Sequence, residues 1–276
     1  MHCRTVPEFA KARGYSESSV LDTQARQKGL IVYDPPAKPG EPPTHVYRHP
    51  TWERAGYLGP LTTDRAGNIY VAPAPRVSLY DNPPEQQNTI YKVDTTSGEM
   101  AEFMRLPAAA PTSSQNPYGV LGLTYDCDTH SLYASSVAGS TLADEVGRIY
   151  QIDLASGKIR SQLVRTDAFG LAVFNGTSGK RLYFGAARAS EIRSVALADD
   201  GRFVGRPRVD VSIVGWGPEG DDKARRIVFD VRNVMTIRGM EFEFNLIATS
   251  ERRQSEYHLA YDPTSDGWRR LEPSAE

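Results

Sequence analysis

The sequence predicts an all-β protein, namely a β-propeller built from four-stranded antiparallel blades. Two kinds of strand pair alternate along the chain. In each kind the same pattern recurs: an apolar strand, a polar turn and a second strand. Long helical periodicity is absent outside residues 6–28, which favours strands in the rest of the chain. Four-stranded units repeated around a ring form a propeller, which leaves only short, protected strand edges.

The first strand pair has a glycine, a short apolar strand, a turn and then a β-rich strand. Its four copies are "YLGPLTTDRAGNIYVAPA" from Tyr57, "VLGLTYDCDTHSLYASSV" from Val120, "AFGLAVFNGTSGKRLYFGAA" from Ala168 and "IRGMEFEFNLIATSE" from Ile237. The turns of the first three copies carry Asp, Asn or Gly, which tolerate hairpin geometry. The fourth copy is shorter and is expected to turn around Asn245.

The second strand pair has a polar turn that ends in glycine. It occurs as "TIYKVDTTSGEMAEF", "RIYQIDLASGKIRSQL", "EIRSVALADDGRFVG" and "YHLAYDPTSDGWRRL". Gly98, Gly157, Gly201 and Gly267 stand where a longer hairpin loop requires a left-handed residue. Near the N-terminus, "GLIVYDPPAKPGEPPTHVYRH" repeats this second pair without the first.

Together the two hairpins make one four-stranded unit, which recurs four times behind a half unit at the N-terminus. Residues 208–234 contain two further β-rich runs, so the pattern allows five or six blades. Ring closure would join the N-terminal hairpin to strands from late in the chain. We expect residues 29–276 to form a single propeller domain and residues 1–28 to be a polar lead or tether.

Composition argues against several classes of protein. The 276 residues are 39% hydrophobic and 24% charged, with a formal net charge of -2, whereas nucleic-acid binders carry a basic patch or stripe. No run approaches the ~20 apolar residues of a membrane span. Two cysteines are too few for a disulfide framework or a multi-cysteine zinc site. We expect a monomer that binds no nucleic acid and has no transmembrane segment.

Cys3 lies almost at the N-terminus, and a polar segment follows it. A lipoprotein whose signal segment had been removed would begin in this way, which predicts a periplasmic or extracellular protein with a lipid anchor on Cys3. The start "MHCRTVPEF" itself lacks the apolar core of a signal peptide. An incidental thiol and a cytoplasmic location are the alternatives.

The segment "GLAVFNGTSGKRLYFGAARASEIRSVALADDGRFVGRPRVDVSI", residues 170–213, resembles a blade of the SMP-30/gluconolactonase-like propeller superfamily. The likeness rests on its "GLA" strand, its "LYF" strand and the run "DDGRFVGRP", while the rest of the chain is similar to NHL-type blades in patterning. This resemblance implies six blades, and we prefer that count. It also implies a site at one mouth of the central channel, near the starts of the innermost strands.

Enzymes of that superfamily hold one divalent cation, often calcium, on Glu, Asn and Asp side chains that project into the channel. Such a cation would polarise a lactone carbonyl and help to generate a water nucleophile. The matching positions of this chain hold Leu58, Leu121, Phe169 and Arg238. None of these side chains is an oxygen ligand, so the metal-dependent chemistry is not expected to carry over at these positions.

Residues that flank the four glycines are expected to line the mouth of the channel. They are Trp52, Glu53, Arg54, Tyr57, Asn116, Tyr118, Asp167, Phe169 and Arg238. Aromatic rings, an arginine and a carboxylate around a concave opening suit a ligand site. The alternative is that Asp167 and Arg238 pair with neighbours while the aromatic rings cap the channel.

Three functions follow as hypotheses. The preferred one is a non-catalytic propeller that binds a small molecule or a protein through its channel mouth. The second is a calcium-dependent lactonase or esterase-like hydrolase, with Glu53, Asn116 and Asp167 as candidate metal ligands. The third is a scaffold that contacts a partner protein through loops such as residues 73–88.

The segment "YDCDTH", residues 125–130, offers two carboxylates, a thiol and an imidazole as metal ligands. It is also the expected turn of a hairpin, and turn chemistry accounts for its Asp and Thr residues. We expect a plain turn.

Overall fold

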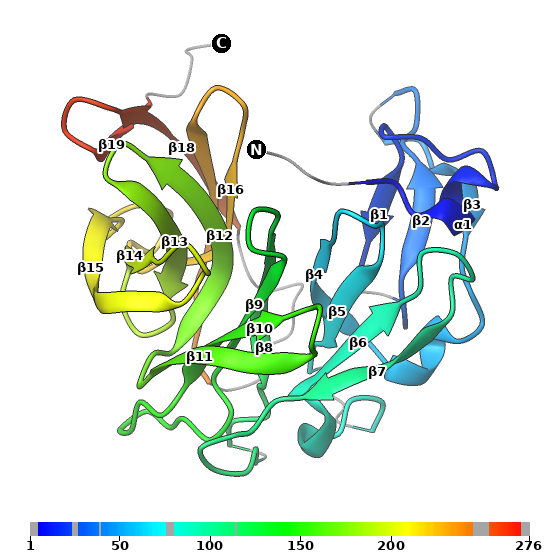
Figure 1. The fold of residues 1–276 in the computed structure, drawn as a ribbon, viewed down its shortest axis with the longest axis horizontal. Helices are drawn as coiled ribbons and strands as arrows, with labels where there is room; N and C mark the ends of the chain where they lie inside the picture. Colours follow the sequence, from blue (N-terminus) through cyan, green and yellow to red (C-terminus); the bar gives the residue numbers. More distant parts are fainter. Residues whose placement is uncertain are drawn as a thin grey trace.

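The computed structural model describes residues 5–23, 27–38, 40–75, 80–113, 115–244 and 254–271. Within these ranges the strands form five antiparallel sheets, which follow one another around the molecule from the N-terminal to the C-terminal part (Figure 1). The predicted all-β propeller is confirmed. It has five blades, so the preference for six is wrong.

Two sheets come from the N-terminal part of the chain. In spatial order, the first contains β1 (Val20–Asp22), β2 (Ile31–Asp34) and β3 (Thr44–Tyr47). The second contains β4 (Leu58–Thr63), β5 (Ile69–Pro73), β6 (Thr89–Val93) and β7 (Met100–Arg105). The short 3-10 helix η1 (Trp52–Ala55) precedes β4, and η2 (Pro84–Gln86) precedes β6.

Three four-stranded sheets follow. The third contains β8 (Val120–Asp126), β9 (Ser131–Ser136), β10 (Arg148–Asp153) and β11 (Lys158–Val164). The fourth contains β12 (Ala168–Gly176), β13 (Gly179–Ala186), β14 (Glu191–Leu197) and β15 (Phe203–Ser212). The fifth contains β16 (Lys223–Phe229), β17 (Val234–Met240), β18 (Ser255–Asp262) and β19 (Gly267–Arg270).

The count of five follows from how residues 208–234 are divided between sheets. Their first β-rich run belongs to β15, the outer strand of the fourth sheet, and their second run is β16, the first strand of the fifth sheet. Both runs complete sheets that the other strands already define. Neither is left over for a sixth blade.

The repeat copy predicted from Ile237 is placed differently from the other three. Residues 237–240 end β17, which pairs with β16 on one side and with β18 on the other. Gly239 therefore lies on the second strand of its sheet, whereas the first three glycines lie on first strands. The predicted turn at Asn245 lies outside the described residues.

The turn between β14 and β15 shows how local sequence and packing agree. Gly201 has φ +81°, the left-handed conformation predicted for it. A Cβ at this residue would lie 2.7 Å from both Nε2 of Gln151 and Oη of Tyr133, which belong to the neighbouring sheet. In the last hairpin the left-handed residue is Asp266, with φ +48°, and not the predicted Gly267.

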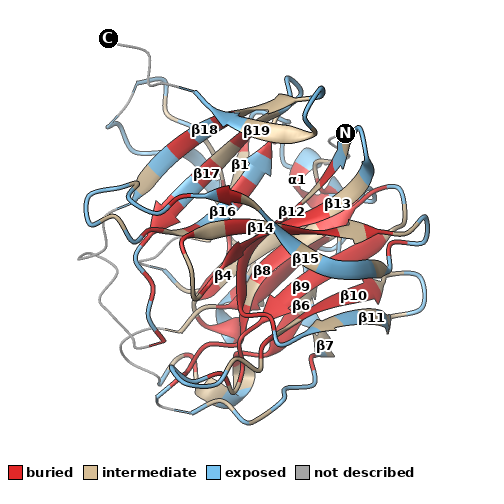
Figure 2. Cartoon of the chain, turned by 90° about the vertical axis from the view of Figure 1, so that its left-hand side faces the viewer, coloured by how far each residue is buried: buried red, intermediate tan, exposed pale blue. Residues whose placement is uncertain are grey.

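The core lies between neighbouring sheets. The innermost strands of the second to fifth sheets, β4, β8, β12 and β16, contact one another in that order. β9 is buried along its whole length, whereas the outer strands β11 and β15 expose many side chains (Figure 2).

No contact comparable to those between the innermost strands joins the first and fifth sheets within the described ranges. The expected closure of the ring through the N-terminal hairpin is therefore not seen there.

The N-terminal segment packs against the first two sheets. Phe9, in the short helix α1 (Glu8–Lys11), is 1% exposed and lies in one hydrophobic cluster with Trp52 and Val71. Its backbone N–H donates to the carbonyl of Thr95 at 2.7 Å. β1 then pairs with β2, so this segment supplies one strand of the first blade. Among the described helices, none has the length and apolarity that a membrane crossing requires.

Candidate functional site

Two of the nine predicted mouth residues bind the loop that follows β9. Nδ2 of Asn116 donates to the carbonyls of Val137 (2.9 Å) and Ser140 (2.7 Å). Oγ of Ser140 donates in turn to Oδ1 of Asp167 at 2.5 Å. Asn116 and Asp167, which are 51 positions apart in the sequence, are thus joined by one loop.

Asp167 is held in a closed polar network. Its side chain is completely buried, and its Oδ2 accepts a hydrogen bond from Nε of Arg188 at 2.6 Å. Its Oδ1 also accepts from the backbone N–H of Gly147 at 3.0 Å. Burial raises the pKa of Asp167, while the hydrogen bonds from Ser140 and Arg188 oppose that rise. The carboxylate therefore joins two loops, and each of its oxygens accepts at least one hydrogen bond from the protein.

Tyr118 and Phe169 belong to an aromatic cluster beside this network. The ring of Phe169 packs edge-on against Phe242, with the centroids 4.3 Å apart, and Tyr118 contacts the same ring at 5.2 Å. Phe244 contacts Phe242 at 5.4 Å, and the guanidinium of Arg188 lies 5.2 Å from the centre of the Phe244 ring. All four aromatic residues are buried. They form a packed plug near the starts of β8 and β12, where the mouth was expected.

The other predicted mouth residues lie elsewhere. Trp52 is fully buried between the first two sheets, and its Nε1–H donates to the carbonyl of Gly98 at 2.8 Å. Arg238 is exposed on β17 and pairs with Glu256 of β18 at 3.2 Å. Glu53 and Arg54 are exposed on η1, and Tyr57 is half-buried.

The candidate calcium ligands do not fit a channel cation. Asn116 uses its amide hydrogens on two carbonyls, and its Oδ1 accepts from the backbone N–H of Tyr118 at 3.1 Å. Asp167 is neutralised by Arg188, and Glu53 lies exposed on η1 in another blade. Within the described residues, no group of three or more His, Cys, Asp or Glu side chains could hold a metal ion.

The turn at residues 125–130 joins two blades electrostatically. Nζ of Lys180, on β13, lies 3.0 Å from Oδ1 of buried Asp126 and 2.6 Å from Oδ2 of Asp128. Oγ1 of Thr129 also donates to Asp126 at 2.7 Å. The two carboxylates therefore belong to a turn, as the sequence suggested, and they also bind the neighbouring blade. Nothing in the sequence pointed to Lys180 as their partner.

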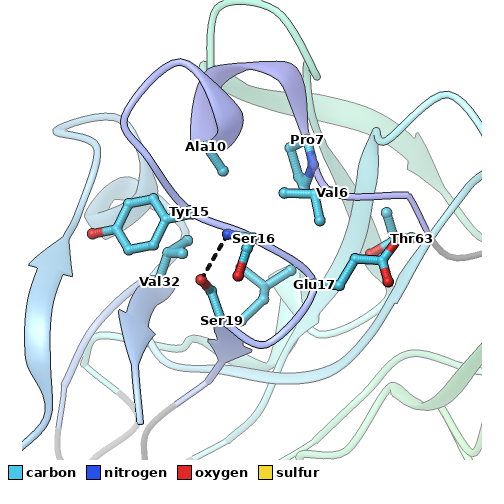
Figure 3. Close-up of a pocket in the computed structure, with 10 residues that line it drawn as sticks. Val6, Pro7, Ala10, Tyr15, Ser16, Glu17, Ser19, Val32 and Thr63 are labelled. Carbon is cyan, nitrogen blue, oxygen red and sulfur yellow. Dashed lines mark hydrogen bonds between the residues drawn. The ribbon is translucent and has the colours of Figure 1, made fainter.

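A cavity of about 290 Å³ lies between the N-terminal segment and the first two sheets (Figure 3). Its apolar lining includes side chains from the segment and from β1 and β2, namely Val6, Pro7, Ala10, Tyr15, Leu21 and Val32. Its polar lining comes from Ser16, Glu17, Ser19 and Thr63. In Figure 3, Glu17 and Thr63 lie at one end of the cavity and Tyr15 lies at the other. Sequence reasoning missed this cavity, because its walls are far apart along the chain.

The polar groups around this cavity differ in how they are bonded. Oη of Tyr15 donates to the carbonyl of His45 at 2.5 Å, and Oγ of Ser19 donates to Asp34 at 2.6 Å. The side chains of Glu17 and Thr63 make no hydrogen bond or ion pair within the described part of the chain. A ligand that offers N–H or O–H groups at that end would find two free acceptors.

Comparison with known proteins supports the propeller fold, but it assigns the chain to no family. No protein-family model and no curated protein matches the sequence. Among solved structures, a protein from Lactobacillus plantarum aligns with a TM-score of 0.54 at 12% identity, over 93% of this chain and 68% of its own.

Two further structures carry functional names. A luciferin-regenerating enzyme aligns with a TM-score of 0.52 at 9% identity, over 89% of this chain and 74% of its own. A calcium-binding protein, regucalcin from Agrobacterium tumefaciens, aligns with a TM-score of 0.50 at 14% identity, over 90% of this chain and 72% of its own. At these identities the likeness shows a shared propeller fold only.

Proposed function

We propose that the protein is a non-catalytic binding protein that holds a small, largely apolar molecule between its N-terminal segment and its first two sheets. One observation carries the proposal: the cavity of about 290 Å³ has a mainly apolar lining and, at one end, two polar side chains that have no partner among the described residues. Ligand sites combine apolar contact area with a few placed polar groups in this way. The ligand that fits best carries one N–H or O–H donor beside its apolar body.

The lining chemistry supports binding without catalysis. Among the described residues, those that line the cavity include no His, Cys, Lys or Arg, and the carboxylate that they contribute belongs to the exposed Glu17. Covalent or acid–base catalysis needs a nucleophile or base that a second group orients. The plug at the expected channel mouth supports the same reading, since Asp167 and Phe169 are engaged in packing and ion pairing.

Fluorescence titration with N-phenylnaphthylamine tests the proposal, because this probe is apolar, carries one N–H and brightens on leaving water. We expect saturable binding to the full chain. Ala10→Leu fills part of the cavity and should weaken binding by at least about tenfold. Its matched control is Ala12→Leu, one position past the same helix and exposed, which should bind like the wild type.

A second variant keeps the test interpretable if the Ala10→Leu protein does not fold. Glu17→Gln removes a charged acceptor from an exposed side chain, so folding should be unaffected, and probe binding should weaken about threefold. Binding that is unchanged in both Ala10→Leu and Glu17→Gln would contradict the proposal. A hydrolytic activity that these variants leave intact would instead favour the lactonase alternative.

We also propose a periplasmic or extracellular location. Cys127 is disulfide-bonded, and structural disulfides persist in oxidising compartments. The predicted lipid anchor falls on Cys3, which lies outside the described residues. Thiol labelling of the denatured protein from its native host should modify Cys127 only after reduction. Labelling of Cys127 before reduction would argue for a reducing compartment.

A further inference from the structure

The structure describes one of the two cysteines of the chain, and this cysteine is covalently bonded. Cys127 lies in the turn between β8 and β9, is buried and forms a disulfide. The only other cysteine in the sequence is Cys3, which lies outside the described residues. Within one chain, Cys3 is therefore the only partner that the composition allows. A bond to a second chain is disfavoured, because Cys127 is buried in its turn.

The described start of the N-terminal segment lies on a turn that also contacts Cys127. Gly67, between β4 and β5, comes so close that a Cβ there would lie 3.1 Å from Cα of Pro7 and 3.4 Å from the carbonyl oxygen of Val6. The guanidinium of Arg65, in the same turn, donates to the carbonyl of Cys127. One turn of the second sheet thus contacts both the segment and the turn that carries the bonded cysteine.

The chain that precedes Val6 is long enough to reach Cys127. Three residue steps lead from Val6 back to Cys3, and an extended chain covers about 3.3–3.6 Å per step. A disulfide adds about 5–6 Å between the two Cα atoms that it joins. The total reach is roughly 16 Å, which is enough to pass the single turn that separates Val6 from Cys127.

We propose that Cys3 and Cys127 form an intramolecular disulfide that straps the N-terminal segment to the third sheet. The bond forms when the two thiols lose two protons and two electrons to a disulfide oxidant, which takes them up and is reduced to two thiols. The segment also supplies β1 of the first sheet, so the strap links the first blade covalently to the third. A sulfur that is engaged in this bond carries no lipid, so the strap replaces the lipid anchor expected on Cys3.

The strap also fixes one wall of the cavity of about 290 Å³, and this consequence rests on the proposed function. Val6 and Pro7 line the cavity, and they are the lining residues nearest to Cys3 in the sequence. Loss of the bond frees only the start of the segment, because the backbone of Phe9 stays bonded to Thr95 and β1 stays paired with β2. We therefore expect a looser wall and weaker ligand binding, without unfolding of the blade.

Peptide mapping of the full chain tests the pairing. The protein is isolated from its native host without reductant, its free thiols are blocked with N-ethylmaleimide, and it is then denatured and digested with trypsin. We expect a crosslinked species that joins residues 1–4 to residues 106–148 and disappears on reduction. Residues 106–148 joined to a second copy of themselves, a blocked thiol on Cys127, or a lipid on Cys3 would each overturn the proposal.

Limited digestion of the native protein with a lysine-specific protease measures the strap without any ligand. Cleavage after Lys11 requires local opening of the segment, and its rate follows the population of the open form. We expect Cys3→Ser to raise this rate about three- to tenfold. Cleavage after Lys158, which is exposed on β11, is the internal control and should not change.

A second variant shows whether the two cysteines act as a pair. Cys127→Ser should raise the rate of cleavage after Lys11 as much as Cys3→Ser does, and the double variant should add nothing, because each single change breaks the same bond. An unchanged rate in Cys3→Ser, or additive effects in the double variant, would contradict the strap.

Titration with N-phenylnaphthylamine separates the strap from the proposed function. We expect Cys3→Ser to bind the probe about threefold more weakly than the wild type. If the crosslinked peptide is found but the wild type binds no probe, the strap stands and the proposed function fails. If the wild type binds the probe but the crosslinked peptide is absent, the proposed function stands and the strap is overturned.

Discussion

The carboxylate of Asp167 lies 2.6 Å from Nε of Arg188 and is completely buried. The position that should have offered a polar group to a ligand instead joins the loop after β9 to the loop after β13. With Phe169 packed against Phe242 beside it, the expected channel mouth is a structural plug. Asp167 and Phe169 are therefore engaged within the protein at the place where a ligand was expected.

The Asp167–Arg188 pair predicts a large loss of stability in Asp167→Ala. Removing one partner of a buried pair leaves the other charge uncompensated, so we expect the free energy of unfolding to fall by about 3–5 kcal/mol. Urea denaturation measures this change. The control is Arg238→Ala, whose exposed pair with Glu256 should be worth no more than about 1 kcal/mol. Similar effects of the two variants would contradict a structural role for Asp167.

The aromatic plug predicts that Phe242→Ala is strongly destabilising. Phe242 contacts three other aromatic rings, and deleting a buried phenyl ring should lower the free energy of unfolding by about 3–5 kcal/mol. Tyr80→Ala is the comparison, since Tyr80 is 92% exposed and should change stability by less than about 0.5 kcal/mol. A stable Phe242→Ala protein that binds new ligands at this place would show instead that the plug is a dispensable cap.

Asp266 predicts a pH dependence of stability. It accepts hydrogen bonds from Ser178 and Tyr261, which hold its pKa at about 2. Because this pKa is lower than in the unfolded chain, Asp266 stabilises the fold above about pH 4 and loses that contribution as the pH falls towards 2. Asp266→Asn should cost about 1–2 kcal/mol at neutral pH and flatten the wild-type decline below pH 4. A variant that declines as steeply as the wild type in urea unfolding would refute this.

Calcium should leave the melting temperature unchanged. The candidate ligands Glu53, Asn116 and Asp167 are dispersed or committed to protein partners, so they offer no common cation site. A cation that bound the native state would raise stability by mass action. Thermal unfolding with calcium, compared with magnesium at equal ionic strength, measures this. A rise specific to calcium would revive the hydrolase hypothesis.

The hairpins could be predicted from sequence because each is a local pattern. The alternation of apolar residues and the turn residues lie within about 15 positions of one another, so strand pairs such as β10–β11 were found. The blade count could not be found in this way, because assigning β15 and β16 to different sheets depends on tertiary pairing. The sequence around Gly239 has the local pattern of the first strand of a blade, but it forms the second strand of its sheet.

The candidate site was less predictable than the fold. Pairing of Asp167 was one of the two possibilities that the sequence allowed, but Arg188 gave no signal in advance. Burial of Phe169 against Phe242 joins residues from different blades. The cavity of about 290 Å³ depends on how the N-terminal segment packs against the first two sheets. No local sequence pattern encodes such contacts.

Intermolecular NMR contacts test the central claim most directly. With N-phenylnaphthylamine bound to the full chain, the account predicts nuclear Overhauser effects between the probe and the methyl groups of Val6, Ala10, Leu21 and Val32, which line the cavity. The N–H of the probe should point towards Glu17. Contacts only to methyl groups elsewhere, or none with these four residues at saturation, would contradict a binding site between the N-terminal segment and the first two sheets.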